Sequence, residues 1–295
     1  MNEFAFIERL RARVAQSRNK TTDLILGIGD DAAILREQTG RELLITTDLL
    51  VEDIDFKLAY IPPAWLGHKA LAVSLSDIAA MGGTPRHALI TLAVSPERTV
   101  ADARALYAGL RKAARKFGVS IVGGETSRSP GPLFINVALT GEVERVRCTL
   151  RSGGRAGDAL YVTGHLGGSR AGKHLDFTPR LAEARWLVAH FKVRAMMDLS
   201  DGLAADLPRL AAASRCGYEL RRDAVPRTPG CTIEQALTDG EDYELLFAIH
   251  PRDTARLESA WKKNFPRLRL TRVGAFNLKS EIRDLKSHGA FDHFA

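Results

Sequence analysis

The sequence predicts an α/β protein of the α+β type, made of two domains. Strand-like segments such as residues 88–94 alternate with helix-like segments such as 99–117, and the first half is the richer in strands. A chain of 295 residues is long enough for two ordinary domains. Positive charge rises and the order of elements changes between residues 142 and 150, so we place the domains at residues 1–146 and 147–295.

Composition restricts the partners and the compartment. The net charge is +7, but no long Lys/Arg run interleaved with aromatics occurs, so nucleic acid is not an expected partner. No apolar run approaches the ~20 residues of a membrane-spanning helix, so we expect no membrane contact. Residues 1–20 have the spacing of an amphipathic helix and carry Glu3 and Glu8, which argues against a signal peptide. Three cysteines without a pairing motif fit a reducing cytoplasm.

The first helix after residue 60 contains a contradiction. Residues 69–83 have apolar side chains at helical spacing, and Gly82 and Gly83 end the pattern. Almost every side chain in it is apolar or small, so the helix should be buried on most faces. Asp77 nevertheless lies inside it. A buried, unpaired carboxylate is costly, so we expect Asp77 to be protonated, paired or bound to a cation.

Other oxygen ligands adjoin strand-like segments earlier in the chain. Asp30 and Asp31 are flanked on both sides by apolar residues, and a β-turn is the alternative to a metal site there. Thr46, Thr47 and Asp48 come at the expected far end of the next strand. Hydroxyl and carboxylate oxygens are the hard ligands that Mg²⁺ takes.

Further acids occupy comparable positions later in the chain. Glu125 follows a strand through an expected glycine turn, which would let the backbone approach a ligand closely. Asp198 follows a short apolar run, and Ser200 or Asp201 is placed to cap the next helix. A helix N-terminus also binds phosphate, but two carboxylates there would repel it unless a cation lay between them.

Together these acids predict several magnesium sites. Six carboxylates beside apolar elements could converge only around divalent cations; they are Asp30, Asp48, Asp77, Glu125, Asp198 and Asp201. Metal sites with glycine turns and arginines indicate nucleotide phosphates and phosphoryl transfer. That chemistry needs positioning and charge cancellation rather than a protein nucleophile.

One glycine-rich segment suggests a different nucleotide site. Residues 167–173 fit the G-x-x-x-x-G-K part of a phosphate-binding loop, but the pattern requires Ser or Thr next, where this chain has His174. Pro179 would also shorten the following helix. We therefore expect a glycine loop covering a helix N-terminus. The alternative, a P-loop NTPase, predicts that Lys173→Ala abolishes ATP binding.

Six short motifs follow one another along the chain: G-I-G-D-D-A-A, T-T-D-L-L-V-E, H-K-A-L-A-V-S-L-S-D-I-A-A-M-G-G, G-G-E-T, M-D-L-S-D-G-L and D-G-E-D-Y-E-L-L-F. In this order they resemble the thiamine-monophosphate kinase family. The similarity runs from about Gly27 to the terminal D-H-F. This family belongs to the superfamily of aminoimidazole ribonucleotide synthetase and selenophosphate synthetase. The resemblance implies an N-terminal mixed-sheet domain that dimerises through its sheet, a C-terminal α/β domain, and ATP in the cleft between them.

The resemblance also implies the reaction and the site residues. A cytoplasmic homodimer would transfer the γ-phosphoryl group of ATP to thiamine monophosphate with several Mg²⁺ ions, giving thiamine diphosphate and ADP. The family's magnesium ligands correspond to Asp30, Thr46, Thr47, Asp48, Asp77, Glu125, Asp198 and Asp201. Its ATP contacts correspond to Tyr107, Gly124, Glu125, Arg151 and Ser200. Its substrate contacts correspond to Asp55, Glu241 and Phe291.

The chain departs from the family at three positions. The family usually has His at Asp55, Asp at Glu125 and Gly-Gly where this chain has Asp239-Gly240. None of these changes removes a carboxylate, so we expect an active enzyme. The alternatives are another ATP-dependent reaction of the superfamily and an inactive nucleotide-binding regulator. Selenophosphate synthetase is disfavoured because its reactive cysteine near the N-terminus has no counterpart before Cys148, and aminoimidazole ribonucleotide synthetase is disfavoured by D-G-E-D-Y-E-L-L-F.

Overall fold

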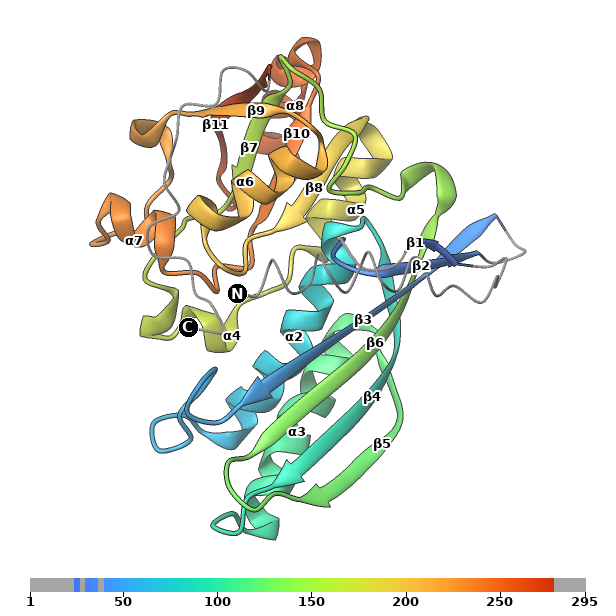
Figure 1. Ribbon diagram of the computed structural model, residues 1–295, viewed down its shortest axis with the longest axis vertical. Helices are drawn as coiled ribbons and strands as arrows, with labels where there is room; N and C mark the ends of the chain where they lie inside the picture. Colours follow the sequence, from blue (N-terminus) through green and yellow to red (C-terminus); the bar gives the residue numbers. More distant parts are fainter. Residues whose placement is uncertain (1–23, 27–29, 37–39, 279–295) are drawn as a thin grey trace.

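The computed structural model describes residues 24–26, 30–36 and 40–278, which form two sheets with helices packed on them (Figure 1). The mixed α/β class predicted from the sequence is confirmed. The helix expected at residues 1–20 and the expected substrate contact Phe291 lie outside the described residues.

The first sheet is mixed. Its strand order is β1-β2-β3-β6-β4-β5, and only β4 and β5 are parallel, because α3 connects them as a crossover. The strands are β1 Leu24–Leu26, β2 Ala33–Arg36, β3 Arg41–Val51, β4 Thr84–Val94, β5 Ser120–Arg128 and β6 Phe134–Glu144.

Two helices, α2 (Pro63–Ala80) and α3 (Val100–Phe117), cover one face of this sheet. A capping box between Thr99 and Asp102 starts α3. The backbones of the two helices come into close contact at Gly109, where a Cβ would lie 1.9 Å from the carbonyl oxygen of Ala64. Helix α2 also contacts α4, α5 and β8 of the second half. Its lack of a polar face therefore reflects burial between the two halves, as its composition predicted.

Two local expectations in this half are wrong. The expected glycine turn before Glu125 is part of β5, which pairs with β4 along its length. Gly124 has φ 151°, and a Cβ there would lie 1.8 Å from the carbonyl oxygen of Ile90, so the approach of β4 itself requires a glycine. Residues 46–48 lie in the middle of β3 rather than at its end, because β3 pairs with β6 as far as Val51.

The second sheet is antiparallel, in the order β8-β10-β7-β11-β9. Alternate residues of the buried β7 enter two different cores, with Tyr161 on one face and Leu160 and Val162 on the other. The strands are β7 Ala159–Thr163, β8 Val193–Asp198, β9 Gly217–Leu220, β10 Leu245–Ile249 and β11 Leu270–Asn277. The helices are α4 Lys173–Asp176, α5 Leu181–His190, α6 Leu203–Ala213, α7 Ile233–Thr238 and α8 Thr254–Asn264, and the short 3-10 turns are η1 Arg145–Arg147, η2 Ser169–Ala171, η3 Arg222–Ala224 and η4 Pro251–Asp253.

The two halves share one core. A single apolar cluster contains Leu44 and Leu75 from the first half and Met196 and Phe247 from the second. The predicted domain boundary after residue 146 falls between the last strand of the first sheet and the first strand of the second, and it stays a prediction. None of the helices in the described ranges is long and apolar enough to cross a membrane.

Candidate functional site

Three carboxylates from distant parts of the chain meet beside the central helix. Asp31 lies two residues before the start of β2, Asp77 lies near the end of α2, and Asp198 is the last residue of β8. Each offers an oxygen atom, and these oxygens all lie within 4.8 Å of one another. Asp31 and Asp198 are buried and Asp77 is half-buried. The packing of both sheets on α2 therefore builds a cluster of hard oxygen donors that suits a divalent cation.

The cluster is electrostatically unfavourable by itself. Burial raises the pKa of Asp77 well above its usual 3.8, and repulsion from Asp48, Asp198 and Asp31 raises it further. Burial, followed by repulsion from Asp31, likewise raises the pKa of Asp198. The Thr46 hydroxyl donates a hydrogen bond to Asp77 and opposes the rise. A cation bound between these carboxylates would remove the repulsion.

The structure separates the roles of the adjacent acids Asp30 and Asp31. Arg151 donates from Nε and Nη2 to the two carboxylate oxygens of Asp31, at 3.0 and 2.8 Å. The backbone N–H of Arg151 donates to Asp30 at 3.0 Å. Burial and then repulsion from Asp31 raise the pKa of Asp30 to about 7. The sequence singled out both acids, but Asp31, which was not selected as a ligand, is the one in the cluster.

The alternation of β3 divides the predicted ligands that it carries. Thr46 and Asp48 face α2, where Asp48 accepts a hydrogen bond from Ser74 Oγ at 2.6 Å. Burial raises the pKa of Asp48. Thr47 points to the exposed face and accepts a hydrogen bond from Asn136 Nδ2 at 2.9 Å. Glu125 is exposed on the edge strand β5. Within one chain the structure does not bring Thr47 or Glu125 to the cluster.

Asp201 has a different local role from the expected cap. The N-cap of α6 is Gly202, and no side chain caps that helix. Arg209 instead forms ion pairs with both Asp201 and Asp206. Asp206 accepts a hydrogen bond from the Asp201 backbone N–H at 3.1 Å, and burial, with repulsion from Asp201, raises its pKa to about 7. The expectation that Ser200 or Asp201 caps the helix is wrong.

A cavity of about 670 Å³ opens next to these acids. Its wall comes from both halves of the chain and includes five residues singled out from the sequence, namely Asp48, Asp55, Ser200, Asp201 and Glu241. Its apolar lining includes Phe56, Ile61, Val73 and Tyr243. Tyr107 lies on α3, partly buried against the core, and neither it nor Gly124 lines the cavity.

Lys69 of α2 connects the two halves of this cavity. Its side chain is fully buried, and Nζ donates to the carboxylate of Glu241 at 2.7 Å and to the carbonyl oxygen of Asp55 at 2.8 Å. Asp55 also accepts a hydrogen bond from the Val51 backbone N–H at 2.7 Å, which closes the loop after β3. Lys69 was not among the residues singled out from the sequence. The available signal was the same as for Asp77, a charged residue inside an otherwise apolar helix.

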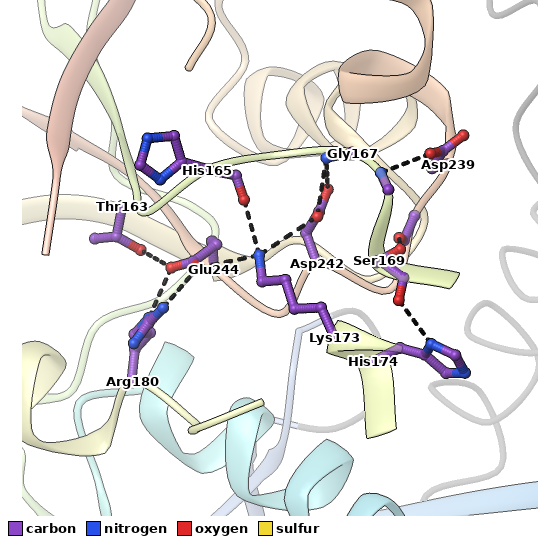
Figure 2. A network of polar contacts seen from close by, with 12 residues as sticks. Thr163, His165, Gly167, Ser169, Lys173, His174, Arg180, Asp239, Asp242 and Glu244 are labelled. Carbon is purple, nitrogen blue, oxygen red and sulfur yellow. Dashed lines mark hydrogen bonds and ion pairs between the residues drawn. The ribbon is translucent and has the colours of Figure 1, made fainter. Parts of the chain in front are cut away.

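Hydrogen bonds to Glu244 hold the acidic turn, residues 239–244, that precedes β10. Arg180 donates from Nε and Nη2 to the buried carboxylate of Glu244, each at 2.6 Å, and the Thr163 hydroxyl donates at 2.8 Å (Figure 2). Burial raises the pKa of Glu244, but the hydrogen bonds from Arg180 outweigh it and leave that pKa below its usual value. In the same turn Glu241 and Tyr243 have positive φ, at 53° and 49°. This anchorage holds the strained turn against the cavity.

In the glycine loop that resembles a phosphate-binding loop, the backbone N–H groups donate hydrogen bonds to side chains of the same chain (Figure 2). Gly167 N–H donates to the Asp242 carboxylate at 3.0 and 3.1 Å, and Gly168 N–H donates to Asp239 at 2.7 Å. The ammonium of Lys173 lies 3.6 Å from Asp242. Groups that would hold phosphate in a P-loop thus bind carboxylates of the same chain, in agreement with the expectation that this is not one.

Comparisons with known proteins connect this site to a family. The N-terminal domain of the AIR synthase related protein family matches residues 29–143, and its C-terminal domain matches residues 168–265. A thiamine-monophosphate kinase from Rhodopirellula baltica is 39% identical over 87% of this chain and 85% of its own, and one from Bacillus subtilis is 34% identical over 84% of each. The structure of AaThiL complexed with AMPPCP and TMP covers 99% of this chain and 97% of its own, with 30% identity and a TM-score of 0.83.

Proposed function

The chain belongs to the thiamine-monophosphate kinase family, and from this premise we propose how its own residues carry out the reaction. The enzyme is a thiamine-phosphate kinase, which transfers the γ-phosphoryl group of ATP to the phosphate of thiamine monophosphate and releases thiamine diphosphate and ADP. The observation that carries the proposal is the meeting of Asp31, Asp77 and Asp198 beside the large cavity.

We assign the cation site to Mg²⁺. The donor set fits this ion, because all three groups that the described part of the chain brings to the cluster are carboxylates, which are hard oxygen ligands. Asp48 lies close enough to Asp77 to repel it, and Asp30 lies close enough to Asp31, so both could supply further oxygen ligands to the site. When bound, Mg²⁺ neutralises charge on the transferring phosphates. The chain's own part is to hold its carboxylates in place through Thr46, Ser74 and Arg151.

We propose that the cavity holds thiamine monophosphate. Thiamine carries a positively charged thiazolium ring, which suits a wall with the carboxylates of Asp55 and Glu241 and the aromatic ring of Tyr243. Lys69 fixes both the loop of Asp55 and the turn of Glu241, so it positions this wall rather than contacting the reaction. Because Asp55 keeps its carboxylate engaged with Val51, its departure from the usual His leaves the loop ordered.

Phosphoryl transfer in such a site requires alignment rather than a protein nucleophile. The acceptor is itself a phosphate oxygen, so no side chain has to form a covalent bond. The predicted ATP contacts Tyr107, Gly124, Glu125, Arg151 and Ser200 stay proposals, and of these only Ser200 lines the cavity. Arg151 is engaged with Asp31, so we assign it to organising the cation site.

We also propose that a second copy of the chain covers the outer face of the first sheet. Leu49 and Leu89 are 53% and 48% exposed on this face, and Val122 of the edge strand is 58% exposed. An apolar surface of this kind is characteristic of an interface. Thr47 points to the same side and would lie in that interface. The free thiols Cys148, Cys216 and Cys231 agree with the proposed cytoplasmic location.

The direct test supplies the purified protein with ATP, Mg²⁺ and thiamine monophosphate and separates the thiamine species by chromatography, with free thiamine as a parallel acceptor. We expect thiamine diphosphate from the monophosphate only, and none after EDTA is added. Binding of ATP without any thiamine diphosphate would instead support a regulator or another reaction of the superfamily.

A further inference from the structure

The acidic side chains on the cavity wall have partners within the part of the chain that the structure describes, whereas two of its basic side chains do not. Its five acidic residues each have a partner on the chain: Asp48 with Ser74, Asp55 with the Val51 N–H, Asp201 with Arg209, Asp239 with the Gly168 N–H, and Glu241 with Lys69. Lys57 and Arg170 also line the cavity and are exposed to it. Neither side chain has a hydrogen-bond or ion-pair partner among residues 24–26, 30–36 and 40–278.

These two cations come from opposite halves of the chain. Lys57 lies in the loop that follows β3, and Arg170 lies in η2 within the glycine loop. In that loop Lys173 forms an ion pair with Asp242, so Arg170 is the residue whose positive charge is available to a ligand. The third basic residue on the wall, His174, contacts the Ser169 carbonyl oxygen at 2.7 Å, and burial lowers its pKa, which favours the neutral ring.

We propose that Lys57 and Arg170 together bind the phosphate of thiamine monophosphate and make the enzyme prefer this ester over unphosphorylated thiamine. This inference rests on the proposed function. Because the five acids have partners and repel anions, a phosphate in this cavity needs cationic partners in addition to magnesium. The acceptor is the better occupant than ATP, since the cavity contains the expected substrate residues Asp55 and Glu241 but only Ser200 of the expected ATP contacts.

The arrangement also fits the geometry of the transfer. Asp48 belongs to the cavity wall and repels Asp77 of the carboxylate cluster, so one end of the cavity adjoins the cation site. A phosphate held there by cations from both halves would be presented to the incoming phosphoryl group, while the thiamine rings occupy the aromatic part of the wall. Removing either cation should therefore weaken phosphate binding without changing the contacts of the rings.

The test measures binding by calorimetry, without turnover, for thiamine monophosphate, thiamine and AMPPCP separately, all with Mg²⁺. The variants are Lys57→Gln and Arg170→Gln, and the matched controls are Lys262→Gln and Arg267→Gln, which are exposed outside the cavity. We expect each cavity variant to bind thiamine monophosphate about tenfold more weakly, corresponding to about 1.4 kcal/mol. Binding of thiamine and AMPPCP should change less than about twofold, and the controls should match the wild type.

Several results would overturn this inference while leaving the kinase assignment intact. Equal weakening for thiamine monophosphate and thiamine would show that the variants disturb the cavity shape. Selective weakening of AMPPCP would move the two residues to the nucleotide site. Unchanged binding by both variants would remove them from the site. Failure of the wild-type protein to bind thiamine monophosphate would instead refute the proposed function itself.

Discussion

Replacing Asp77 with Asn should make the metal-free protein more stable while it removes activity. Two unit charges 4.8 Å apart repel by about 3 kcal/mol at an effective dielectric constant of 20. Protonation and solvent screening reduce this value, so we expect Asp77→Asn to raise the free energy of unfolding in EDTA by about 1–3 kcal/mol. The asparagine retains an oxygen that can accept the hydrogen bond from Thr46.

The same variant should lose its response to magnesium. A ligand at 100 times its dissociation constant stabilises the folded state by about 2.7 kcal/mol, and this increment should disappear when one of three carboxylates is neutral. Loss of the charge at the site should also lower kcat by a factor of about 10²–10³. Thermal unfolding at pH 8 with EDTA and with Mg²⁺, together with the chromatographic assay of thiamine diphosphate, measures all three effects.

Asp223→Asn is the matched control, because Asp223 is exposed in η3, outside the site. It should resemble the wild type in each measurement. If Asp77→Asn kept the magnesium-dependent stabilisation and the wild-type rate, the cation site would not be where the three carboxylates meet, and the reasoning from their repulsion would be refuted.

Three further perturbations test the anchorage of the site and the outer sheet face. Arg180→Met should lower the free energy of unfolding, measured in urea, by about 3–5 kcal/mol, because it leaves Glu244 buried without its main partner. The control Arg222→Met removes an exposed ion pair and should lower it by less than about 1 kcal/mol. Since Arg180 keeps the pKa of Glu244 below its usual 4.5, the wild-type ion pair should stabilise the fold fully above that pH and progressively less as the pH falls through the lowered value. Lys69→Met should raise KM for thiamine monophosphate by about tenfold or more, with partial rescue by Lys69→Arg, because the cavity wall loses its link. Leu89→Lys should shift the particle mass in light scattering from dimer to monomer at unchanged secondary structure.

Each of these expectations has a contrary outcome. Similar losses of stability for the two arginine variants would mean that burial of the carboxylate does not matter. An unchanged KM in the Lys69→Met variant would show that the bonds from Lys69 to Glu241 and Asp55 do not position the cavity wall. A dimer that persisted in the Leu89→Lys variant would place the interface elsewhere.

Much of the fold could be predicted because its signals are local. The capping residue Thr99 and the stop at Gly118 bound α3 at the expected residues, since both act through contacts within one helical turn. The composition of α2 correctly indicated burial on most faces. The acid inside that helix was informative for the same reason, because a charge in an apolar segment needs a partner whatever the tertiary structure is.

What failed depended on contacts that a local pattern does not show. Glycines before Glu125 favour a turn locally, but β4 pairs with this segment and keeps it in a strand. Asp201 has the composition of a cap, but Arg209 engages its side chain and Gly202 takes that position. In both places the contacts of the folded chain outweighed the local preference, which for a helix cap is worth about 1 kcal/mol.

By itself, the sequence determined the class of fold, the presence of acids that require cations and the family, because these follow from composition and from ordered motifs. Only the tertiary structure decided which acids meet. It placed Asp31 rather than Asp30 in the cluster and turned Thr47 away from it. The physical reason is that these side chains meet only through packing between segments that are distant in the sequence. Along β3, neighbouring residues point to opposite faces, and pairing with β6 and packing against α2 put Thr47 on the outer face. Before β2, Arg151 from the second half binds the side chain of Asp31.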